Sequence, residues 1–217
     1  MAFYPSFIIV DDHPLYRQGV VTLVQQELNL KLEGEAGSIT EALELLSQRR
    51  VDLAIIDISL QEKSGLELIK IIKNDYPQVK VLVVSMHEES LYGERALAAG
   101  ALGYVMKHER PEVLLNAIRT VLDGRIAVSD HLRDRMLSGI VGGHTSKDPI
   151  ERLSDRELEV FRLIGKGYSA AEIAEALHLS VKTINAYRDH IKEKLNLSSA
   201  SDLRRYAVDW IASRERL

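Results

Sequence analysis

The chain has 217 residues, of which 46% are hydrophobic and 28% are charged, and its formal net charge is −4. This composition is typical of a folded globular protein and excludes a wholly disordered one. Cysteine is absent, which excludes disulfides, thiolate metal sites and thiol nucleophiles, and the apolar runs are strand-sized, too short to span a bilayer.

The N-terminal segment MAFYPSFIIVDDHP has no basic stretch before its apolar run and reaches two aspartates at once. It therefore lacks the pattern of a secretory signal. We expect a cytoplasmic protein with no membrane partner.

From residue 7 to about residue 123, short apolar runs alternate with segments of helical periodicity. This pattern predicts repeated βα units around a parallel sheet, because strands that are covered on both faces read as continuous apolar runs. We expect strands at 7–11, 30–36, 53–57, 79–85 and 102–105, and helices near 14–27, 39–48, 65–74, 90–99 and 111–123. Five βα units give a doubly wound α/β domain with a five-stranded parallel sheet.

Several helix starts of this region have a local sequence signal. Ser38 is followed three residues later by Glu41, which predicts a capping box. Pro14 and Pro111 suit the first turn of a helix.

The second half of the chain changes character after residue 125. Segment 129–138 has a helical composition, and SGIVGGHTSKDP then collects glycines, small polar residues and a proline. Residues 150–215 predict successive helices, with a stop at Gly167. We expect a domain at 1–125, a linker with a helix at 126–149 and an all-α domain at 150–217. Caps are expected for Ser154 with Glu157, Ser169 with Glu172 and Ser199 with Asp202.

Acidic residues follow two strands of the predicted sheet. Asp11 and Asp12 end the first strand and Asp57 ends the third. Because functional groups gather at the carboxyl edge of a parallel sheet, we expect these carboxylates to converge. Their repulsion favours a bound cation, and oxygen ligands with room for water suit Mg²⁺. Lys107, in the run YVMK after the fifth strand, supplies a counter-charge.

This pattern resembles response-regulator receiver domains over about residues 7–123. The resemblance rests on DDHP after the first strand, a lone aspartate after the third, Ser85 ending the fourth, and Tyr104 with Lys107 at the fifth. The family fold is flavodoxin-like. The loop DISLQEKSG departs from the family, because Gln61 stands where a proline is common.

The resemblance implies that a sensor histidine kinase transfers a phosphoryl group to Asp57. It further implies that Mg²⁺ is held by Asp11, Asp12, Asp57 and the backbone carbonyl of Ser59. Ser85 and Lys107 would bind the phosphoryl oxygens, and the ring of Tyr104 would enter the space that Ser85 leaves. His13 has no role in this mechanism, and we interpret it as a helix-start residue.

In the C-terminal domain, predicted helices at 154–166, 170–177 and 181–195 have helix-turn-helix spacing. On a helical wheel, Ile184, Ile191 and Leu195 face inward, with Val181 near the edge of that face. The outward face suits DNA: Asn185 pairs with adenine, Asp189 with cytosine and Ala186 with the thymine methyl group. The remaining candidates for DNA contact are Lys182, Arg188 and Lys192, which reach phosphates, and Thr183, which flanks the outward face.

This domain resembles the LuxR-type DNA-binding domain through LSDRELEV, GYSAAEIAEALHLSVKTI and HIKEKL, over about residues 150–215. With the receiver in front, the whole chain is similar to the NarL/FixJ family. The resemblance implies that helix 181–195 enters the major groove of double-stranded DNA, with Asn185, Ala186 and Asp189 toward the bases and Arg188 leaning inward. It also implies a homodimer when phosphorylated, formed through the last helix, about 200–213. Tyr206, Val208 or Trp210 would contribute, although Trp210 better suits the core.

Two other functions fit parts of the pattern. An Mg²⁺-dependent aspartyl phosphohydrolase would need an aspartate two residues after its nucleophile, but position 59 is serine. A protein adaptor would use phosphorylation without binding DNA. We expect a regulator rather than an enzyme, in which phosphorylation acts through the linker at 139–149 to relieve masking of helix 181–195 or a block on dimerisation.

Overall fold

The computed structural model describes residues 4–60, 64–142 and 149–214. The chain forms two compact units, residues 1–143 and residues 144–217. Within the described ranges, no helix is long and apolar enough to cross a membrane. Gln61 and part of the predicted linker lie outside the described residues, and the predicted domain limits at 125 and 149 stay predictions.

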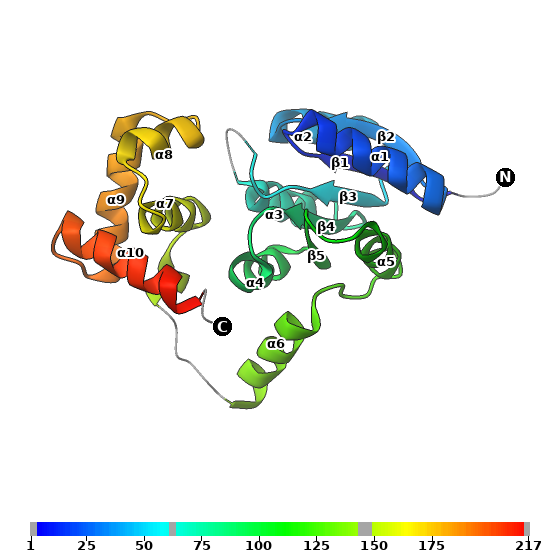
Figure 1. Ribbon diagram of the computed structural model, residues 1–217. Coiled ribbons are helices and arrows are strands. Elements are labelled where there is room, and N and C mark those ends of the chain that lie inside the picture. Colours follow the sequence, from blue (N-terminus) through cyan, green and yellow to red (C-terminus); the bar gives the residue numbers. More distant parts are fainter. Residues whose placement is uncertain (1–3, 61–63, 143–148, 215–217) are drawn as a thin grey trace. The chain divides into compact units, whose positions relative to one another are not determined.

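The first unit is built on one sheet in which all strands are parallel. Its order is β2-β1-β3-β4-β5, so the direction of winding reverses between β1 and β3 (Figure 1). This confirms the predicted α/β fold, with each strand boundary within one residue of its expected place. The strands are β1 Ser6–Val10, β2 Lys31–Ala36, β3 Leu53–Ile56, β4 Lys80–Ser85 and β5 Gly103–Met106.

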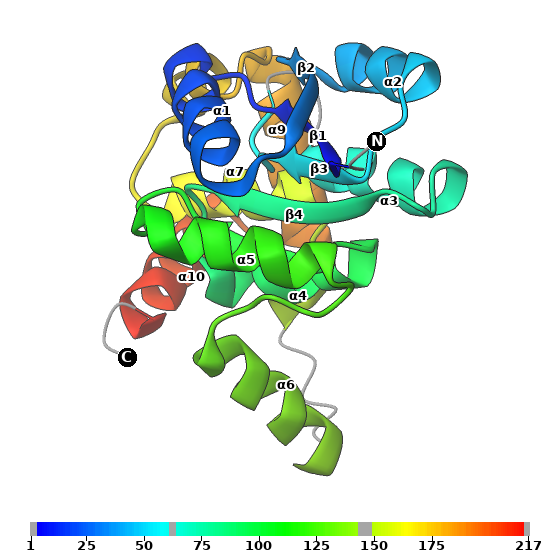
Figure 2. The ribbon, with the colours of Figure 1, turned by 90° about the vertical axis from the view of Figure 1, so that its right-hand side faces the viewer.

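Helices cover both faces of the sheet. In Figure 2, α1 lies on the side of the sheet opposite α2 and α3, and side chains of α1 and α5 share a core cluster with the strands. Because both faces are covered, every residue of β1 and β3 is buried. The helices of this unit are α1 Pro14–Leu28, α2 Ile39–Gln48, α3 Gly65–Asp75, α4 Glu89–Ala99, α5 Pro111–Leu122 and α6 Asp130–Gly142.

Most predicted helix starts are present. Pro14 and Pro111 occupy the first turns of α1 and α5. The Ser38 hydroxyl accepts a hydrogen bond from the Glu41 N–H, as expected. The Glu41 carboxylate, however, accepts from the N–H of Gly37 at 2.7 Å, one residue before the partner that a capping box predicts.

A glycine lets α3 begin directly against the end of β3. The N–H of Gly65 donates to the carbonyl oxygen of Ile58 at 2.8 Å. A Cβ atom at Gly65 would overlap the carbonyl oxygen of Asp57 and lie 3.0 Å from the Ile58 Cα. These neighbours are backbone atoms that cannot turn away, so the loop after β3 requires glycine here.

The second unit is all-helical within the described residues, as predicted. Of the three expected caps, those at Ser154 with Glu157 and at Ser169 with Glu172 are complete capping boxes. At the third, the Ser199 hydroxyl accepts from the Asp202 N–H at 3.1 Å and donates to the Asp202 carboxylate at 2.7 Å. The turn between the second and third α-helices of this unit contains His178 with φ 53°. The elements are the short 3₁₀ helix η1 Pro149–Arg152, followed by α7 Asp155–Gly165, α8 Ala170–Ala176, α9 Val181–Leu195 and α10 Ala200–Arg214.

Phe161 on α7 lies in the core of this unit. Ile184 and Ile191 of α9 are fully buried, as the helical wheel predicts. Trp210 is half-buried, with its ring centroid 5.5 Å from that of Phe161 in an edge-on arrangement, which agrees with a core role. Val181, expected near the edge of the inward face, is 45% exposed. It is the first residue of α9, and the buried face of this helix begins only at Ile184.

We expect Gly65→Ala to destabilise the first unit by about 1–3 kcal/mol, because the added methyl group must displace backbone. Gly19→Ala is the control: it lies in the interior of α1 with open space around its Cβ position, so alanine should stabilise by up to about 1 kcal/mol. Urea unfolding followed by circular dichroism measures both. Equal effects at the two positions would contradict the close approach at Gly65.

Candidate functional site

Three carboxylates converge at the carboxyl edge of the sheet, as the sequence predicts. Oxygen atoms of Asp11, Asp12 and Asp57 lie within 4.8 Å of one another, together with a ring nitrogen of His13. Asp11 and Asp57 are 1% and 2% exposed. Each aspartate is held by a backbone hydrogen bond to the adjacent strand. The Asp57 N–H donates to the carbonyl oxygen of Val10 on β1, and the Asp11 N–H donates to that of Ala36 on β2.

Lys107 is buried among these carboxylates. Its Nζ lies 2.7 Å from Asp11 Oδ2 and 2.7 Å from Asp57 Oδ2, and its side chain is 4% exposed. The Nζ also lies 4.6 Å from the centroid of the Tyr16 ring. The expected counter-charge is therefore shared between the two deepest carboxylates.

Burial and charge compete in the pKa values of this cluster. Burial, helped by the nearby Asp11, raises the pKa of the Asp57 carboxyl above its usual range, although the Lys107 ammonium opposes this. Burial alone would lower the pKa of Lys107, but the carboxylates of Asp57 and Asp11 outweigh it and raise that pKa. Burial, with the charges of both carboxylates, also raises the pKa of Tyr16.

The donor set fits a hard divalent cation. Three carboxylates face one buried ammonium, so negative charge remains to be neutralised. Asp12 Oδ1 is buried and receives no hydrogen bond within the described residues; it lies 2.7 Å from Nδ1 of His13, a ring that is 65% exposed. The N–H of Ser59 donates to Asp57 Oδ1 at 3.1 Å, which places Ser59 beside the same carboxylate.

Ser85 and Tyr104 belong to a network centred on His87. The N–H of His87 donates to Ser85 Oγ at 3.2 Å, and the Tyr104 hydroxyl donates to the His87 carbonyl oxygen at 2.7 Å. The His87 ring lies 2.8 Å from Ser59 Oγ and stacks on Tyr92 with centroids 4.6 Å apart. Burial raises the pKa of Tyr104, which is held neutral in this network.

Three residues of this site were not found by sequence reasoning. His87 gives no signal in the sequence, because its contacts come from the ends of other strands. Tyr16 lies on α1, where the sequence pattern predicts a helix and gives no sign of a contact with Lys107. His13 does occupy the helix start, as expected, but its ring also contacts Asp12 and Asp11, and its place next to two aspartates was the available clue.

In the second unit, α9 presents the predicted outward face. Lys182, Asn185, Ala186 and Asp189 are exposed, and Arg188 is half-buried, in agreement with its inward lean on the wheel. The remaining two candidates already have partners: the Thr183 hydroxyl lies 2.8 Å from that of Ser180 at the helix start, and Lys192 pairs with Asp189 at 3.0 Å.

Glu157 of α7 holds the far end of α9. Its Oε2 accepts from Lys194 Nζ at 2.6 Å and from the Ser154 N–H at 2.6 Å. Burial alone would raise the pKa of Glu157, but these hydrogen bonds outweigh burial and hold it below its usual range. The capping residue of one helix thus fixes the position of another.

Comparison with known proteins agrees with both units. Residues 7–119 match the response regulator receiver domain, and residues 151–207 match the bacterial regulatory proteins of the luxR family. The oxygen regulatory protein NreC of Staphylococcus epidermidis is 35% identical over 210 residues, which cover 94% of this chain and 96% of that protein. NreC of Staphylococcus carnosus is 34% identical over 209 residues, with 94% and 96% covered.

The chain belongs to the NarL/FixJ family of two-component response regulators. Members of this family regulate transcription through a LuxR-type DNA-binding domain. The resemblance drawn from the sequence is therefore confirmed.

Solved structures of similar response regulators extend the comparison. RcsB of Salmonella enterica serovar Typhimurium, bound to promoter rprA in the presence of the phosphomimetic BeF₃⁻, has a TM-score of 0.62 and 27% identity, and covers 95% of this chain and 99% of its own. A structure of two RcsB dimers bound to two parallel DNAs has a TM-score of 0.57 and 28% identity, with 94% and 98% covered.

We expect Lys107→Ala to destabilise the metal-free receiver unit of this response regulator by about 3–5 kcal/mol, because it leaves buried carboxylates without their cation. Lys31→Ala is the control, since Lys31 is 67% exposed and its pair with Glu33 contributes less than about 1 kcal/mol. Urea unfolding in EDTA, followed by circular dichroism, measures both. Similar losses for the two variants would contradict the buried pairing.

Glu157→Gln should weaken the second unit at neutral pH by about 1 kcal/mol, because glutamine retains the cap but loses the ion pair with Lys194. The folded pKa is lowered, so the stabilisation is present above the unfolded carboxyl pKa and disappears as pH falls through the folded value. The difference from wild type should therefore vanish in acid. Fluorescence of Trp210, the single tryptophan, reports this unit, and exposed Glu175 is the control for glutamine substitution.

Proposed function

We propose that this response regulator accepts a phosphoryl group on Asp57 from a sensor histidine kinase, with Mg²⁺, and thereby controls its dimerisation and its binding to promoter DNA. The convergence of Asp11, Asp12 and Asp57 around Lys107 carries the proposal. Its target is DNA, so we also propose that it acts in the cytoplasm.

The proposed chemistry is a transfer from a phosphohistidine to the Asp57 carboxylate. A carboxylate oxygen attacks phosphorus while the bond from phosphorus to the histidine nitrogen breaks. Mg²⁺, held by Asp11, Asp12, Asp57 and the Ser59 carbonyl, would neutralise the carboxylates and the phosphoryl oxygens. Lys107, whose ammonium is already 2.7 Å from Asp57, would donate to one phosphoryl oxygen.

The switch proposed for this site uses the His87 network. Ser85 would donate a hydrogen bond to a second phosphoryl oxygen. Its hydroxyl would then lose the hydrogen bond that it accepts from the His87 N–H at 3.2 Å. Tyr104 is already buried, with its hydroxyl on the His87 carbonyl oxygen, and its ring would shift further into the space that Ser85 vacates. The loss of these neutral hydrogen bonds is offset by charge-assisted bonds to the phosphoryl group.

The proposed DNA contacts lie on α9. The exposed Asn185, Ala186 and Asp189 would face base edges in the major groove. Lys182, Arg188 and Lys192 would reach phosphates, and Thr183 would lie beside the groove, where its hydroxyl already supports the helix start. The RcsB structures bound to DNA support DNA binding as the role of this unit.

For dimerisation we propose the last helix, α10. Val208 is 42% exposed and Tyr206 is half-buried, so both offer apolar surface to a second copy. The RcsB dimers on DNA support a dimeric state. Family membership favours this regulator over the aspartyl phosphohydrolase and the protein adaptor.

Phosphate incorporation tests the chemistry. With Mg²⁺ and a phosphorylated histidine kinase, the full chain should gain one base-labile phosphate at Asp57, and EDTA should prevent this. Asp57→Asn should gain none, whereas Asp75→Asn, an exposed control on α3, should behave as wild type. Incorporation that persists in Asp57→Asn would refute the assignment.

Two α9 variants test the DNA contacts in the full phosphorylated chain. Asn185→Ala should lose about 1–3 kcal/mol of discrimination at one base pair, because it removes a base contact. Lys182→Ala should weaken all sequences alike and reduce the salt slope by about one, because it removes a phosphate contact. Genomic footprinting locates the sites. Unchanged DNA binding in both variants would exclude this face of α9.

A further inference from the structure

His13 stands next to the acidic pocket, and its backbone is restricted by its neighbours. It is the N-cap residue of α1, with φ −98° and ψ 99°, and the proline that follows holds it in extended backbone. Its N–H donates to Asp11 Oδ1 at 2.9 Å, which orients that carboxylate. The His13 side chain makes no capping hydrogen bond, so the start of the helix does not use the imidazole ring.

The Nδ1 atom of this ring lies among the carboxylate oxygens proposed to hold the metal. It is 2.7 Å from Asp12 Oδ1 and 3.3 Å from Asp11 Oδ1. An oxygen atom of Asp57 belongs to the same group, whose ligand atoms all lie within 4.8 Å of one another. Around an octahedral ion with bonds of about 2.1 Å, neighbouring ligand atoms are roughly 3 Å apart and opposite ones roughly 4 Å apart. The spacing of these four side chains therefore fits one ion.

A hydrogen bond does not explain the short contact between His13 and Asp12. Asp12 Oδ1 is buried, and within the described residues it accepts no hydrogen bond, although Nδ1 of His13 lies only 2.7 Å away. The ammonium of Lys107 is shared by Asp11 and Asp57 and adds no bond to this oxygen. A buried acceptor without a donor costs free energy. A cation bound by both the oxygen and the ring nitrogen would remove that cost.

An imidazole nitrogen changes which metal ion such a site prefers. Mg²⁺ binds oxygen ligands and keeps several waters, so a nitrogen ligand adds little to its affinity. Imidazole suits divalent transition metals, whose affinity for sites of nitrogen and oxygen ligands rises from Mn²⁺ through Co²⁺ to Ni²⁺. For such an ion, His13 would take a coordination position that a water occupies around Mg²⁺.

We propose that His13, through Nδ1, is a fourth side-chain ligand of the acidic pocket and makes it select a divalent transition-metal ion over Mg²⁺. This inference rests on the proposed metal site at Asp57. The ring is 65% exposed, so it can adjust onto an ion without disturbing the core. The two kinds of ion would compete for the same carboxylates, and their relative concentrations would decide which one is bound.

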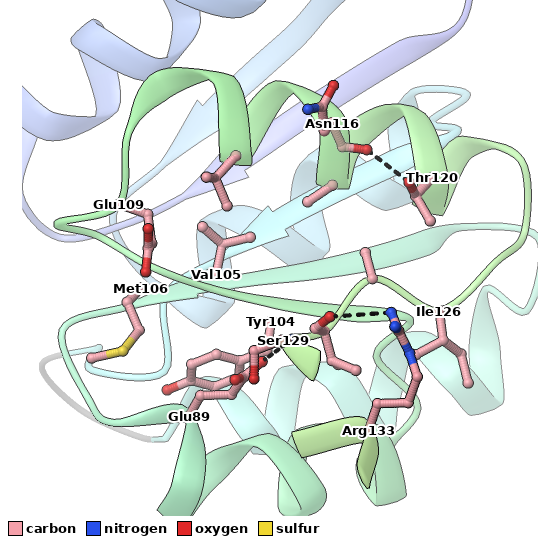
Figure 3. Close-up of a pocket in the computed structure, with 14 residues that line it drawn as sticks. Glu89, Tyr104, Val105, Met106, Glu109, Asn116, Thr120, Ile126, Ser129 and Arg133 are labelled. Atoms are coloured by element: carbon pink, nitrogen blue, oxygen red, sulfur yellow. Dashed lines mark hydrogen bonds between the residues drawn. The ribbon is translucent and has the colours of Figure 1, made fainter. Parts of the chain in front are cut away.

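A second pocket of the receiver unit carries carboxylates but does not offer a comparable site. It encloses about 300 Å³ between α5, β5 and the start of α6, and Figure 3 shows Glu89 and Glu109 among the residues that line it. Glu89 Oε1 already accepts from the Ser129 N–H at 2.9 Å, and none of the described lining residues is a histidine. In the part of the chain that the structure describes, only the group with His13 brings together three or more histidine or acidic side chains that could hold a metal. One ion per chain is therefore expected.

Isothermal titration calorimetry of the full chain with Co²⁺, and separately with Mg²⁺, tests the selectivity. Each ion should bind at one site per chain. His13→Ala should weaken Co²⁺ binding by about tenfold and change Mg²⁺ binding by less than about twofold, because only the nitrogen ligand is lost. Alanine keeps the N–H that donates to Asp11. His131→Ala, at an exposed position of α6, is the matched control and should retain both affinities.

Proton NMR of the Co²⁺-loaded chain tests the coordination directly. A histidine ring bonded to paramagnetic Co²⁺ gives strongly shifted proton resonances, whereas carboxylate ligands contribute no ring protons. These resonances should be present in the wild type and in His131→Ala and absent in His13→Ala. Unchanged Mg²⁺ binding in His13→Ala verifies that the pocket of this variant is folded.

An equal loss of Co²⁺ and Mg²⁺ affinity in His13→Ala would mean that His13 only supports the shape of the pocket, and the inference would fail. Shifted ring resonances that are missing from the wild type, or that persist in His13→Ala, would exclude His13 as the ligand. If the wild-type chain binds neither ion, the proposed Mg²⁺ site itself fails, and with it the proposed phosphorylation of Asp57.

Discussion

The placement of Lys107 between two buried carboxylates is the interaction on which the rest of the receiver unit depends. Asp11 and Asp57 follow β1 and β3, adjacent strands, and both are almost fully buried. Without a cation, two charges so close in a low-dielectric environment would destabilise the edge of the sheet. One ammonium neutralises part of this charge, and the negative charge that remains makes the site suitable for a metal cation.

The same edge gives the proposed phosphorylation of Asp57 a set of hydrogen bonds on which to act. His87 links Ser85 and Tyr104 through its backbone and Ser59 through its ring. The two backbone hydrogen bonds are between neutral groups, and neutral hydrogen bonds contribute only about 0.5–1.5 kcal/mol. A phosphoryl group, with its charge and strong acceptors, is able to replace them. These hydrogen bonds therefore hold in the unphosphorylated protein, but a phosphoryl group on Asp57 would compete with them successfully.

In the DNA-binding unit, the helices are positioned by the capping residues at their N-termini. Ser154 and Ser169 begin two helices with complete capping boxes, and Glu157, a member of the first, also holds Lys194 of α9. The apolar side of α9 packs through Ile184 and Ile191 on the core around Phe161. Polar groups at the start of α7 thus orient α9, the helix proposed to contact DNA.

Local pattern and spacing in the sequence determined the elements, their order and the residues that meet at the sheet edge. Continuous apolar runs specify buried parallel strands, and the carboxyl ends of such strands share one edge of the sheet. The sequence alone therefore predicts that Asp11, Asp57 and Lys107 lie together. Only the tertiary structure decided the contacts between segments far apart in the chain. His87 meets Ser59, Gly65 meets the Asp57 carbonyl, and Leu132 fills the space above Gly93. Such contacts depend on loop paths and side-chain packing, which have no period along the sequence.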